Sequence, residues 1–118
     1  MTISRVEIVT SMSKLEDLRI ELSKVGVTGM TVLQALGCGV QKGAMEFATQ
    51  ENKIMELLPK QMIILYVPSD IVPKIEDVVK KCLYTGHIGD GKIFVSDVTD
   101  VIRVRTGAQG IEALDNEV

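Results

Sequence analysis

Residues 61–95 read QMIILYVPSDIVPKIEDVVKKCLYTGHIGDGKIFV, and this stretch decides the fold. It opens with an uninterrupted apolar run over 62–67, which predicts a buried strand. A helix capped by Ser69 or Asp70 is expected next, because apolar side chains recur at helical spacing over 71–83 and Pro73 falls where the first helical turn tolerates it. A glycine-containing loop follows, and a further strand is expected over 92–96, with an extended tail beyond it through Arg105. The stretch therefore predicts strand, helix, glycine loop and strand in that order.

The residues before this stretch repeat the strand and helix pattern. Residues 5–10 alternate apolar and polar side chains, which predicts a strand with one buried face. Ser13 and Glu16 have the spacing of a capping box, and helical spacing continues to Gly26, where the helix is expected to stop. A second strand is expected over 30–36.

The complete order is βαββαβ, which predicts an α+β, ferredoxin-like fold in a single domain over residues 1–118. Its antiparallel sheet would carry two helices on one face. Apolar residues on the other face would meet water in a monomer, so a homo-oligomer is expected.

The composition limits the classes of function. The net charge is −3, which argues against a general nucleic-acid binder, because such proteins need clustered positive charge. No apolar run reaches the length of about 18 residues that a membrane helix needs, and the first ten residues lack a signal-peptide pattern. Cys38 and Cys82 have no metal-ligand spacing. We therefore expect a cytoplasmic protein with free thiols that is not inserted in a membrane.

The glycine loop and the residues after it combine three glycines with three cations. These are Gly86, Gly89, Gly91, Lys92, Arg103 and Arg105. Glycine lets the backbone approach an anion closely, and in an extended chain Arg103 and Arg105 would project from the same face. The combination predicts polyphosphate binding. It is not a Walker P-loop, because this loop follows a helix and Lys92 is followed by Ile93.

Five segments in chain order resemble the PII signal-transduction family. They are residues 29–32, 37–43, 58–60, 85–95 and 102–107. The resemblance covers about residues 3–114. It implies a ferredoxin-like homotrimer that binds ATP or ADP competitively in clefts between subunits, reports energy state and regulates nitrogen utilization without catalysis of its own.

The resemblance also divides the chain into functional segments. The T-loop, which docks on target proteins, would be about residues 38–58, the B-loop about 84–92 and the C-terminal loop about 99–118. Met45 and Phe47 are candidate docking residues in the T-loop. By family analogy the target is a membrane transporter or its ATPase subunit.

The resemblance assigns nucleotide contacts to one set of residues. They are Thr31, Gly37, Gly39, Val40, Gln41, Gly89, Asp90, Gly91, Lys92, Arg103 and Arg105. The lysine and the arginines would hold phosphates, for which a point charge and a planar fork are suited. Gln41 would help to ligate magnesium with ATP, and Gln41 together with Lys60 would meet 2-oxoglutarate.

Three positions depart from the family pattern. Val40 stands where the family has an arginine that reaches toward the terminal phosphate, which weakens the case for ATP over ADP and for 2-oxoglutarate sensing. Lys53 aligns with the tyrosine that is uridylylated in many members, and Glu51 with a serine that is phosphorylated in some. Neither modification is therefore expected. The divergent T-loop implies a target other than the usual nitrogen-metabolism partners.

Two other functions compete with a nucleotide sensor. A phosphotransferase on the same fold would use His87, but its motif contains no partner to orient this histidine. An RNA-recognition module would stack bases on sheet aromatics, and the tyrosines and phenylalanines here do not form such a paired motif. The preference between ADP and ATP stays open.

Overall fold

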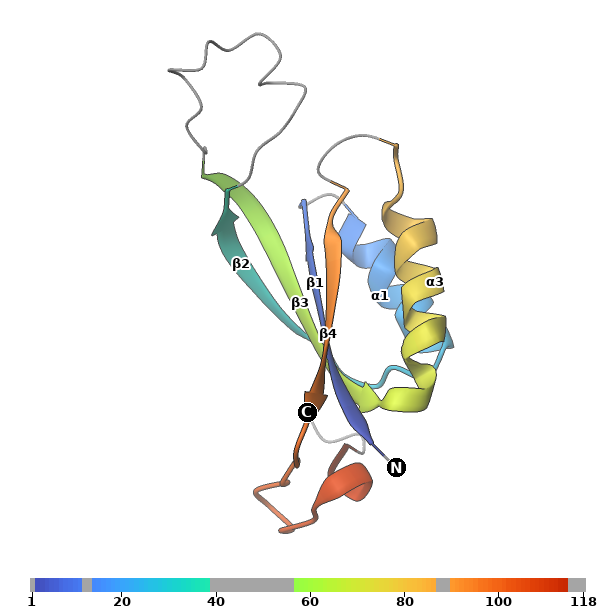
Figure 1. The fold of residues 1–118 in the computed structure, drawn as a ribbon, viewed down its shortest axis with the longest axis vertical. Helices are drawn as coiled ribbons and strands as arrows, with labels where there is room; N and C mark the ends of the chain where they lie inside the picture. Colours follow the sequence, from blue (N-terminus) through green and yellow to red (C-terminus); the bar gives the residue numbers. More distant parts are fainter. Residues whose placement is uncertain (1, 12–13, 39–56, 87–89, 115–118) are drawn as a thin grey trace, which may run out of the picture.

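The computed structural model describes residues 2–11, 14–38, 57–86 and 90–114. The elements are β1 (Ile3–Thr10), α1 (Leu15–Lys24), β2 (Thr31–Gly37), β3 (Leu58–Pro68), η3 (Ser69–Ile71), α3 (Val72–Leu83), β4 (Lys92–Val98) and η4 (Gly110–Leu114). The two η elements are short 3-10 helices. The order of strands and α-helices is the predicted βαββαβ (Figure 1).

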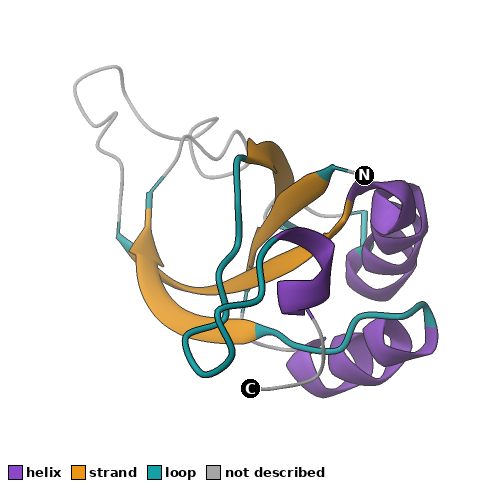
Figure 2. Ribbon diagram, turned by 90° about the horizontal axis from the view of Figure 1, so that it is seen from below, coloured by secondary structure: helices purple, strands orange, loops and turns teal. Residues whose placement is uncertain are grey.

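The four strands form one antiparallel sheet in the order β2-β3-β1-β4. Both α-helices lie on one side of this sheet, as Figure 2 shows from below. The arrangement confirms the predicted ferredoxin-like fold. It also leaves the opposite side, which we call the open face, without an α-helix.

Strand alternation builds the core between the sheet and the helices. On β1, Val6 and Ile8 are fully buried, while Arg5 and Glu7 project from the open face. The other largest fully buried side chains come from α1, β3 and α3. They are Leu18, Leu22, Ile63, Leu65 and Ile75. The core is therefore aliphatic, in keeping with the low aromatic content.

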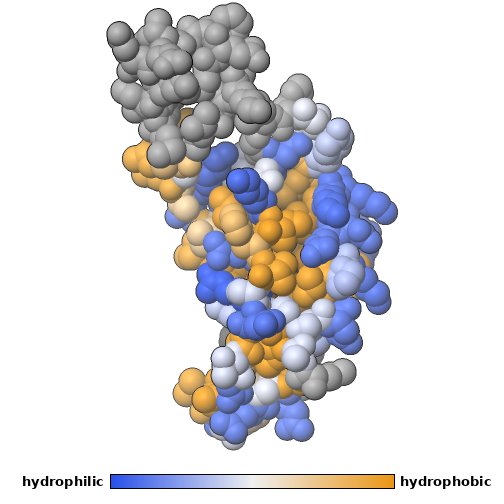
Figure 3. All heavy atoms as spheres, viewed as in Figure 1, coloured by the Kyte–Doolittle hydropathy of each residue, from blue (hydrophilic) through white to orange (hydrophobic). Residues whose placement is uncertain are grey.

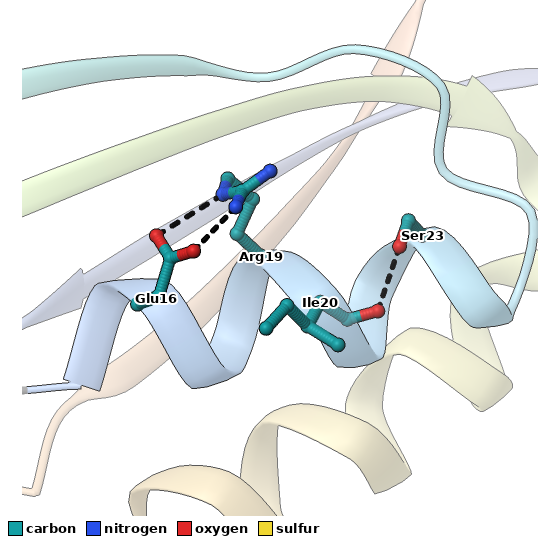
Figure 4. Close-up of polar contacts among 4 residues, drawn as sticks. All are labelled: Glu16, Arg19, Ile20 and Ser23. Carbon is teal, nitrogen blue, oxygen red and sulfur yellow. Dashed lines mark hydrogen bonds and ion pairs between the residues drawn. The ribbon is translucent and has the colours of Figure 1, made fainter.

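The start of α1 differs from the predicted capping box. The residue before the helix is Lys14, which makes no side-chain capping bond, and Ser13 lies outside the described residues. The carboxylate of Glu16 instead accepts two hydrogen bonds from Arg19, one of them from Nε at 3.2 Å (Figure 4). This hydrogen bonding, and then the charge of Arg19, lowers the pKa of Glu16. Because both side chains are exposed, the pair adds little to stability.

The end of α1 agrees with the prediction. Gly26 has a φ of +100°, a left-handed conformation that favours glycine. Its N–H donates to the carbonyl of Ser23 at 3.3 Å, and the N–H of Val27 donates to the carbonyl of Leu22 at 3.2 Å. These two bonds form a Schellman motif. Figure 4 also shows the Ser23 hydroxyl donating to the carbonyl of Ile20 at 2.7 Å.

The start of α3 differs from the prediction that Ser69 or Asp70 caps it. The turn η3 comes first, so Ile71 is the residue before α3, and no side-chain capping bond is made. The Ser69 hydroxyl instead shares a hydrogen bond of 2.6 Å with the hydroxyl of Ser4. Pro73 does lie in the first turn of α3, as predicted.

The segment after β4 differs from the prediction that it is extended through Arg105. The chain turns over residues 104–106 and comes back, with Ile102 forming an isolated bridge to Gln109. The N–H of Arg103 donates to the carbonyl of Ala108 at 2.9 Å. Arg103 and Arg105 therefore do not share one face of a strand, contrary to the prediction.

The open face and the outer strand β2 expose apolar side chains. Among them are Val32, Leu33, Leu36, Tyr66 and Phe94. Figure 3 shows apolar surface over the strands on one side of the molecule, with polar side chains along the outer side of the helices. This exposure is what the prediction of a homo-oligomer requires. In the described part of the chain, neither α-helix has the length and apolar character that a membrane span needs.

Candidate nucleotide-binding site

The glycine loop is closed by the side chain of Asp90. Its carboxylate accepts hydrogen bonds from the N–H of Thr85 at 2.8 Å, from the N–H of Gly86 at 3.1 Å and from the hydroxyl of Thr85. The two ends of the loop are thereby tied together, on either side of residues 87–89, which lie outside the described residues. Asp90 thus has a structural role at the predicted site.

The last glycine of the loop lies against β1. Gly91 has a φ of +122°, and a Cβ atom there would be 2.5 Å from the carbonyl oxygen of Val9. Beside it, the Thr10 hydroxyl donates to the carbonyl of Asp90 at 2.9 Å. Only glycine fits this position without displacing β1 or the loop. The loop is therefore anchored on the sheet immediately before Lys92.

A pocket of about 180 Å³ lies beside the anchored loop. It is lined by Val79, Lys80, Leu83, Tyr84, Asp90, Gly91, Lys92 and Ile93. The lining combines apolar side chains from α3 and β4 with Lys80 and Asp90, whereas strand alternation places the side chain of Lys92 on the open face. Such a surface is suited to a ligand that has a flat or apolar part.

A second hollow lies at the β2–β3 hairpin, where the expected T-loop begins. It has a volume of about 360 Å³ and is lined by Gln34, Ala35, Leu36, Pro59 and Lys60. The Lys60 side chain crosses Gly37 so closely that a Cβ there would be 2.8 Å from the Lys60 Cγ. Gly37 thus has a packing reason to be glycine, and the contact places Lys60 beside the base of this loop.

The strand register brings the two regions to one end of the sheet. Thr10 is paired with Gln61, next to Lys60, while Val9 is paired with Lys92. Strand alternation then places Lys60 and Lys92 on the open face. Five predicted residues meet at this end, which we call the loop end. They are Gly37, Lys60, Asp90, Gly91 and Lys92. Thr31 lies farther down the sheet, opposite Ile64, and is exposed.

Arg103 and Arg105 lie at the opposite end of the sheet from Lys92. The seven residues of β4 separate the loop end from the segment that carries the arginines, a span of about 20 Å (Figure 1). Nη2 of Arg103 donates to the carbonyl of Glu112 at 2.9 Å, and Arg105 lies exposed in the turn over 104–106. A single chain therefore does not bring all three predicted phosphate ligands together.

Several predicted residues lie outside the described part of the chain. They are Gly39, Val40, Gln41, Met45, Phe47, His87 and Gly89. Their assigned roles in nucleotide, magnesium and partner binding stay predictions. Within the described ranges, no group of three or more His, Cys, Asp or Glu side chains could hold a metal ion.

Two threonines shape the site although no sequence motif pointed to them. Thr10 and Thr85 both donate hydrogen bonds to Asp90, one to its carbonyl and one to its carboxylate. A weak signal was available, because threonine at a strand or helix end often bonds to a nearby loop. The long-range contact of Thr10 depends on β1 lying beside β4, which spacing alone does not give.

The two cysteines differ in environment. Cys38, at the end of β2, is exposed, whereas Cys82 on α3 is partly buried, and both are free thiols as expected. Burial raises the pKa of the Cys82 thiol, and the carboxylates of Glu21 and Asp17 raise it further. Cys82 is therefore a packing residue with low reactivity.

Comparison with known proteins identifies the family. The family model described as Nitrogen regulatory protein P-II matches residues 3–108. Nitrogen regulatory protein P-II 1 of Escherichia coli K12 is 43% identical over 110 residues, which cover 93% of this chain and 98% of that protein. Nitrogen regulatory protein P-II of Bradyrhizobium diazoefficiens is 38% identical with the same coverage.

Solved structures agree with the sequence comparison. The B. subtilis GlnK–ATP complex has a TM-score of 0.81 at 35% identity, covering 95% of this chain and 97% of that one. The structure of B. subtilis GlnK has a TM-score of 0.80 at 33% identity, covering 96% and 99%. The match covers nearly the whole chain, and it confirms the resemblance seen in the sequence. The chain belongs to the P-II nitrogen regulatory protein family.

Proposed function

We propose that this protein is a non-enzymatic sensor of adenine nucleotides that regulates a partner protein through the segment at about residues 38–58. The family match and the similarity to a GlnK chain bound to ATP support a nucleotide effector. ATP or ADP would bind at the loop end of the sheet. The alternative of a phosphotransferase is not favoured, because the relatives are regulatory proteins.

The observation that carries this proposal is the anchored glycine loop. Asp90 ties the two ends of the loop, and Gly91 lies against Val9 with no room for a side chain. The N–H groups of Thr85 and Gly86 already donate to Asp90, so the loop would bind phosphate oxygens through its other N–H groups, and a closed loop can present these without first losing conformational freedom. Lys92 follows directly and adds a positive charge.

The proposed nucleotide site lies between copies of the chain in a homotrimer. Support comes from the arginines, which lie at the opposite end of the sheet from Lys92 in the same chain. A neighbouring copy would bring its Arg103 and Arg105 to the loop end of the first. The exposed apolar side chains of the open face and of β2 provide surface for such an assembly.

The proposed response to the nucleotide is transmitted through the segment at about residues 38–58. Gly37 and Lys60 lie at its base, close to the loop end of the sheet. A ligand that favours one arrangement of this segment would shift its population and so change binding to a target protein. The target class that we propose is a membrane transporter or its ATPase subunit.

Magnesium and 2-oxoglutarate are proposed as further ligands of the same site. Lys60 offers a point charge to a carboxylate at the loop end, and Gln41 would contact both ligands. Val40 takes the place of an arginine at the γ-phosphate end. This loss of one cation favours a weaker discrimination between ATP and ADP.

Isothermal titration calorimetry tests the proposal. ADP, ATP and Mg-ATP are titrated into the protein, the last with and without 2-oxoglutarate. Saturable binding of an adenine nucleotide supports the sensor function, and a 2-oxoglutarate signal only with Mg-ATP would add carbon and nitrogen status to what is sensed. Absence of binding for all three nucleotides would contradict the proposal.

A further inference from the structure

One charged cluster lies within the otherwise apolar open face. Arg5 and Glu7 project from the same face of β1, and Nη2 of Arg5 donates to Oε2 of Glu7 at 3.0 Å. Nη1 of Arg5 donates to the hydroxyl of Tyr66 on β3 at 3.3 Å. The guanidinium carbon also lies 5.9 Å from the centroid of the tyrosine ring. We call these three residues the Arg5–Glu7–Tyr66 cluster.

The cluster is surrounded by apolar residues of the neighbouring strands. Glu7 is paired with Ile64 on β3 and with Phe94 on β4. Already in a single chain, the side chain of Glu7 is only 25% exposed and that of Arg5 35%. A molecule that covers the open face would therefore remove the water that still solvates both charges.

We infer that the Arg5–Glu7–Tyr66 cluster anchors the contact between copies of this chain. The inference rests on the proposed function, which already requires a second copy, because Lys92 and Arg103 lie at opposite ends of the sheet. A second copy also fits the composition of this surface. Its own open face offers apolar side chains that would cover the cluster, and the cluster's two charges already neutralise each other within one chain.

The energetics of ion pairs give this inference a distinctive signature. Removing one charge of an exposed pair changes stability little. Removing one charge of a pair that is covered on association leaves the other desolvated and unpaired, which is strongly unfavourable, whereas replacing both by apolar residues removes the desolvation as well. Single and double variants thus differ sharply in self-association only where the neighbouring copy covers the cluster.

Sedimentation equilibrium of four proteins tests the inference. They are the wild type, Arg5→Met, Glu7→Leu and the double variant with both changes. Each single variant is expected to raise the subunit dissociation constant by about 30-fold or more, and the double variant to stay within about tenfold of the wild type. Circular dichroism establishes that each variant is folded. Should the single variants not fold, Tyr66→Phe removes only the hydroxyl, and a threefold to tenfold weakening is expected, on the order of one lost hydrogen bond.

A matched control uses the ion pair between Lys24 and Glu21 on α1. Nζ of Lys24 lies 2.9 Å from Oε1 of Glu21, and both side chains are exposed on the helix side of the sheet. Lys24→Met and Glu21→Leu are expected to leave the dissociation constant unchanged within about twofold.

Single variants of the cluster that associate as tightly as the wild type, or a wild type that is monomeric, would overturn the inference. Nucleotide titration of the wild type separates this result from failure of the proposed function. Nucleotide binding with fully assembled single variants refutes the cluster alone. Absence of nucleotide binding together with weakened single variants refutes the sensor and supports the cluster.

Discussion

Gly91 lies so close to β1 that a Cβ atom on it would be 2.5 Å from the carbonyl oxygen of Val9. The contact fixes where the glycine loop ends and where β4 begins. The same position has a φ of +122°, so a side chain there is disfavoured by the backbone conformation as well as by the contact. The position of the loop on β1 therefore depends on the small size of Gly91 as well as on its left-handed backbone conformation.

The first prediction concerns Gly91→Ala. We expect it to lower the free energy of unfolding by about 2–4 kcal/mol, because the strained φ and the displacement of β1 add together. Urea unfolding measures the change. Gly107→Ala is the matched control, since Gly107 also has a positive φ, +72°, but a Cβ there would contact nothing within 4 Å. Equal losses for the two variants would show that the contact with Val9 has no energetic weight.

The second prediction concerns Asp90→Ala, which removes the acceptor that ties Thr85 and Gly86 to the end of the loop. Hydrogen exchange at these two amides should become at least about tenfold faster, the equivalent of about 1.4 kcal/mol of lost protection. Nucleotide affinity should fall as well, because the loop must then be ordered on binding. Asp97→Ala on β4 is the control. Unchanged exchange at Thr85 and Gly86 would contradict the closing role of Asp90.

The third prediction concerns Gln61, which is buried on the helix side of β3. Its Oε1 is the buried side-chain polar atom that has no hydrogen-bond partner among the described residues. Gln61→Met keeps the shape and removes the unpaired oxygen, so we expect the free energy of unfolding to rise by about 1 kcal/mol. Thermal unfolding of this variant beside Gln34→Met, at an exposed position, measures the effect. A lower free energy of unfolding for Gln61→Met would mean that the side-chain amide of Gln61 has hydrogen-bond partners in solution.

The fourth prediction concerns the two thiols. Cys38 is exposed, whereas burial raises the pKa of Cys82. At pH 8 the fraction of Cys82 that is thiolate is therefore smaller than for a thiol with an ordinary pKa. Because Cys82 is also less exposed, a disulfide reagent should label Cys38 first and Cys82 at least about tenfold more slowly. Cys38→Ser identifies which phase belongs to which residue. Two thiols that react at one common rate would contradict the buried position of Cys82.

Much of the fold could be predicted from local pattern. Alternation identified β1, the apolar run identified β3, and Gly26 marked the end of α1, because each of these depends on neighbouring residues alone. The start of α3 could not be predicted, because Ser69 bonds to Ser4 on a distant strand. Likewise Thr10 reaches Asp90 only because β1 and β4 are paired.

The segment that carries Arg103 and Arg105 shows where the alternation of side chains along a strand fails as a guide. Arg103 and Arg105 have strand spacing, yet the chain reverses between them and Ala108, held by backbone hydrogen bonds at Arg103. Gly107 and Gly110, both with positive φ, make this reversal possible. Two glycines so close together after an alternating segment were the signal for a turn.

The central claim is that adenine nucleotides bind between copies of the chain, with Lys92 from one copy and Arg103 from its neighbour. Lys92→Ala and Arg103→Ala are each expected to weaken nucleotide binding by about tenfold or more, because each removes a cation from the phosphates. Circular dichroism of Arg103→Ala is needed alongside, since Arg103 also holds the carbonyl of Glu112.

The most direct measurement is calorimetric titration of ATP into a mixed assembly of these two variants, formed by unfolding and refolding them together. If the site is shared, each mixed trimer contains one cleft with both wild-type residues, and wild-type affinity returns at that fraction of sites. If Lys92 and Arg103 act within one chain, no cleft regains both residues, and affinity that stays as weak as in the separate variants would contradict the account.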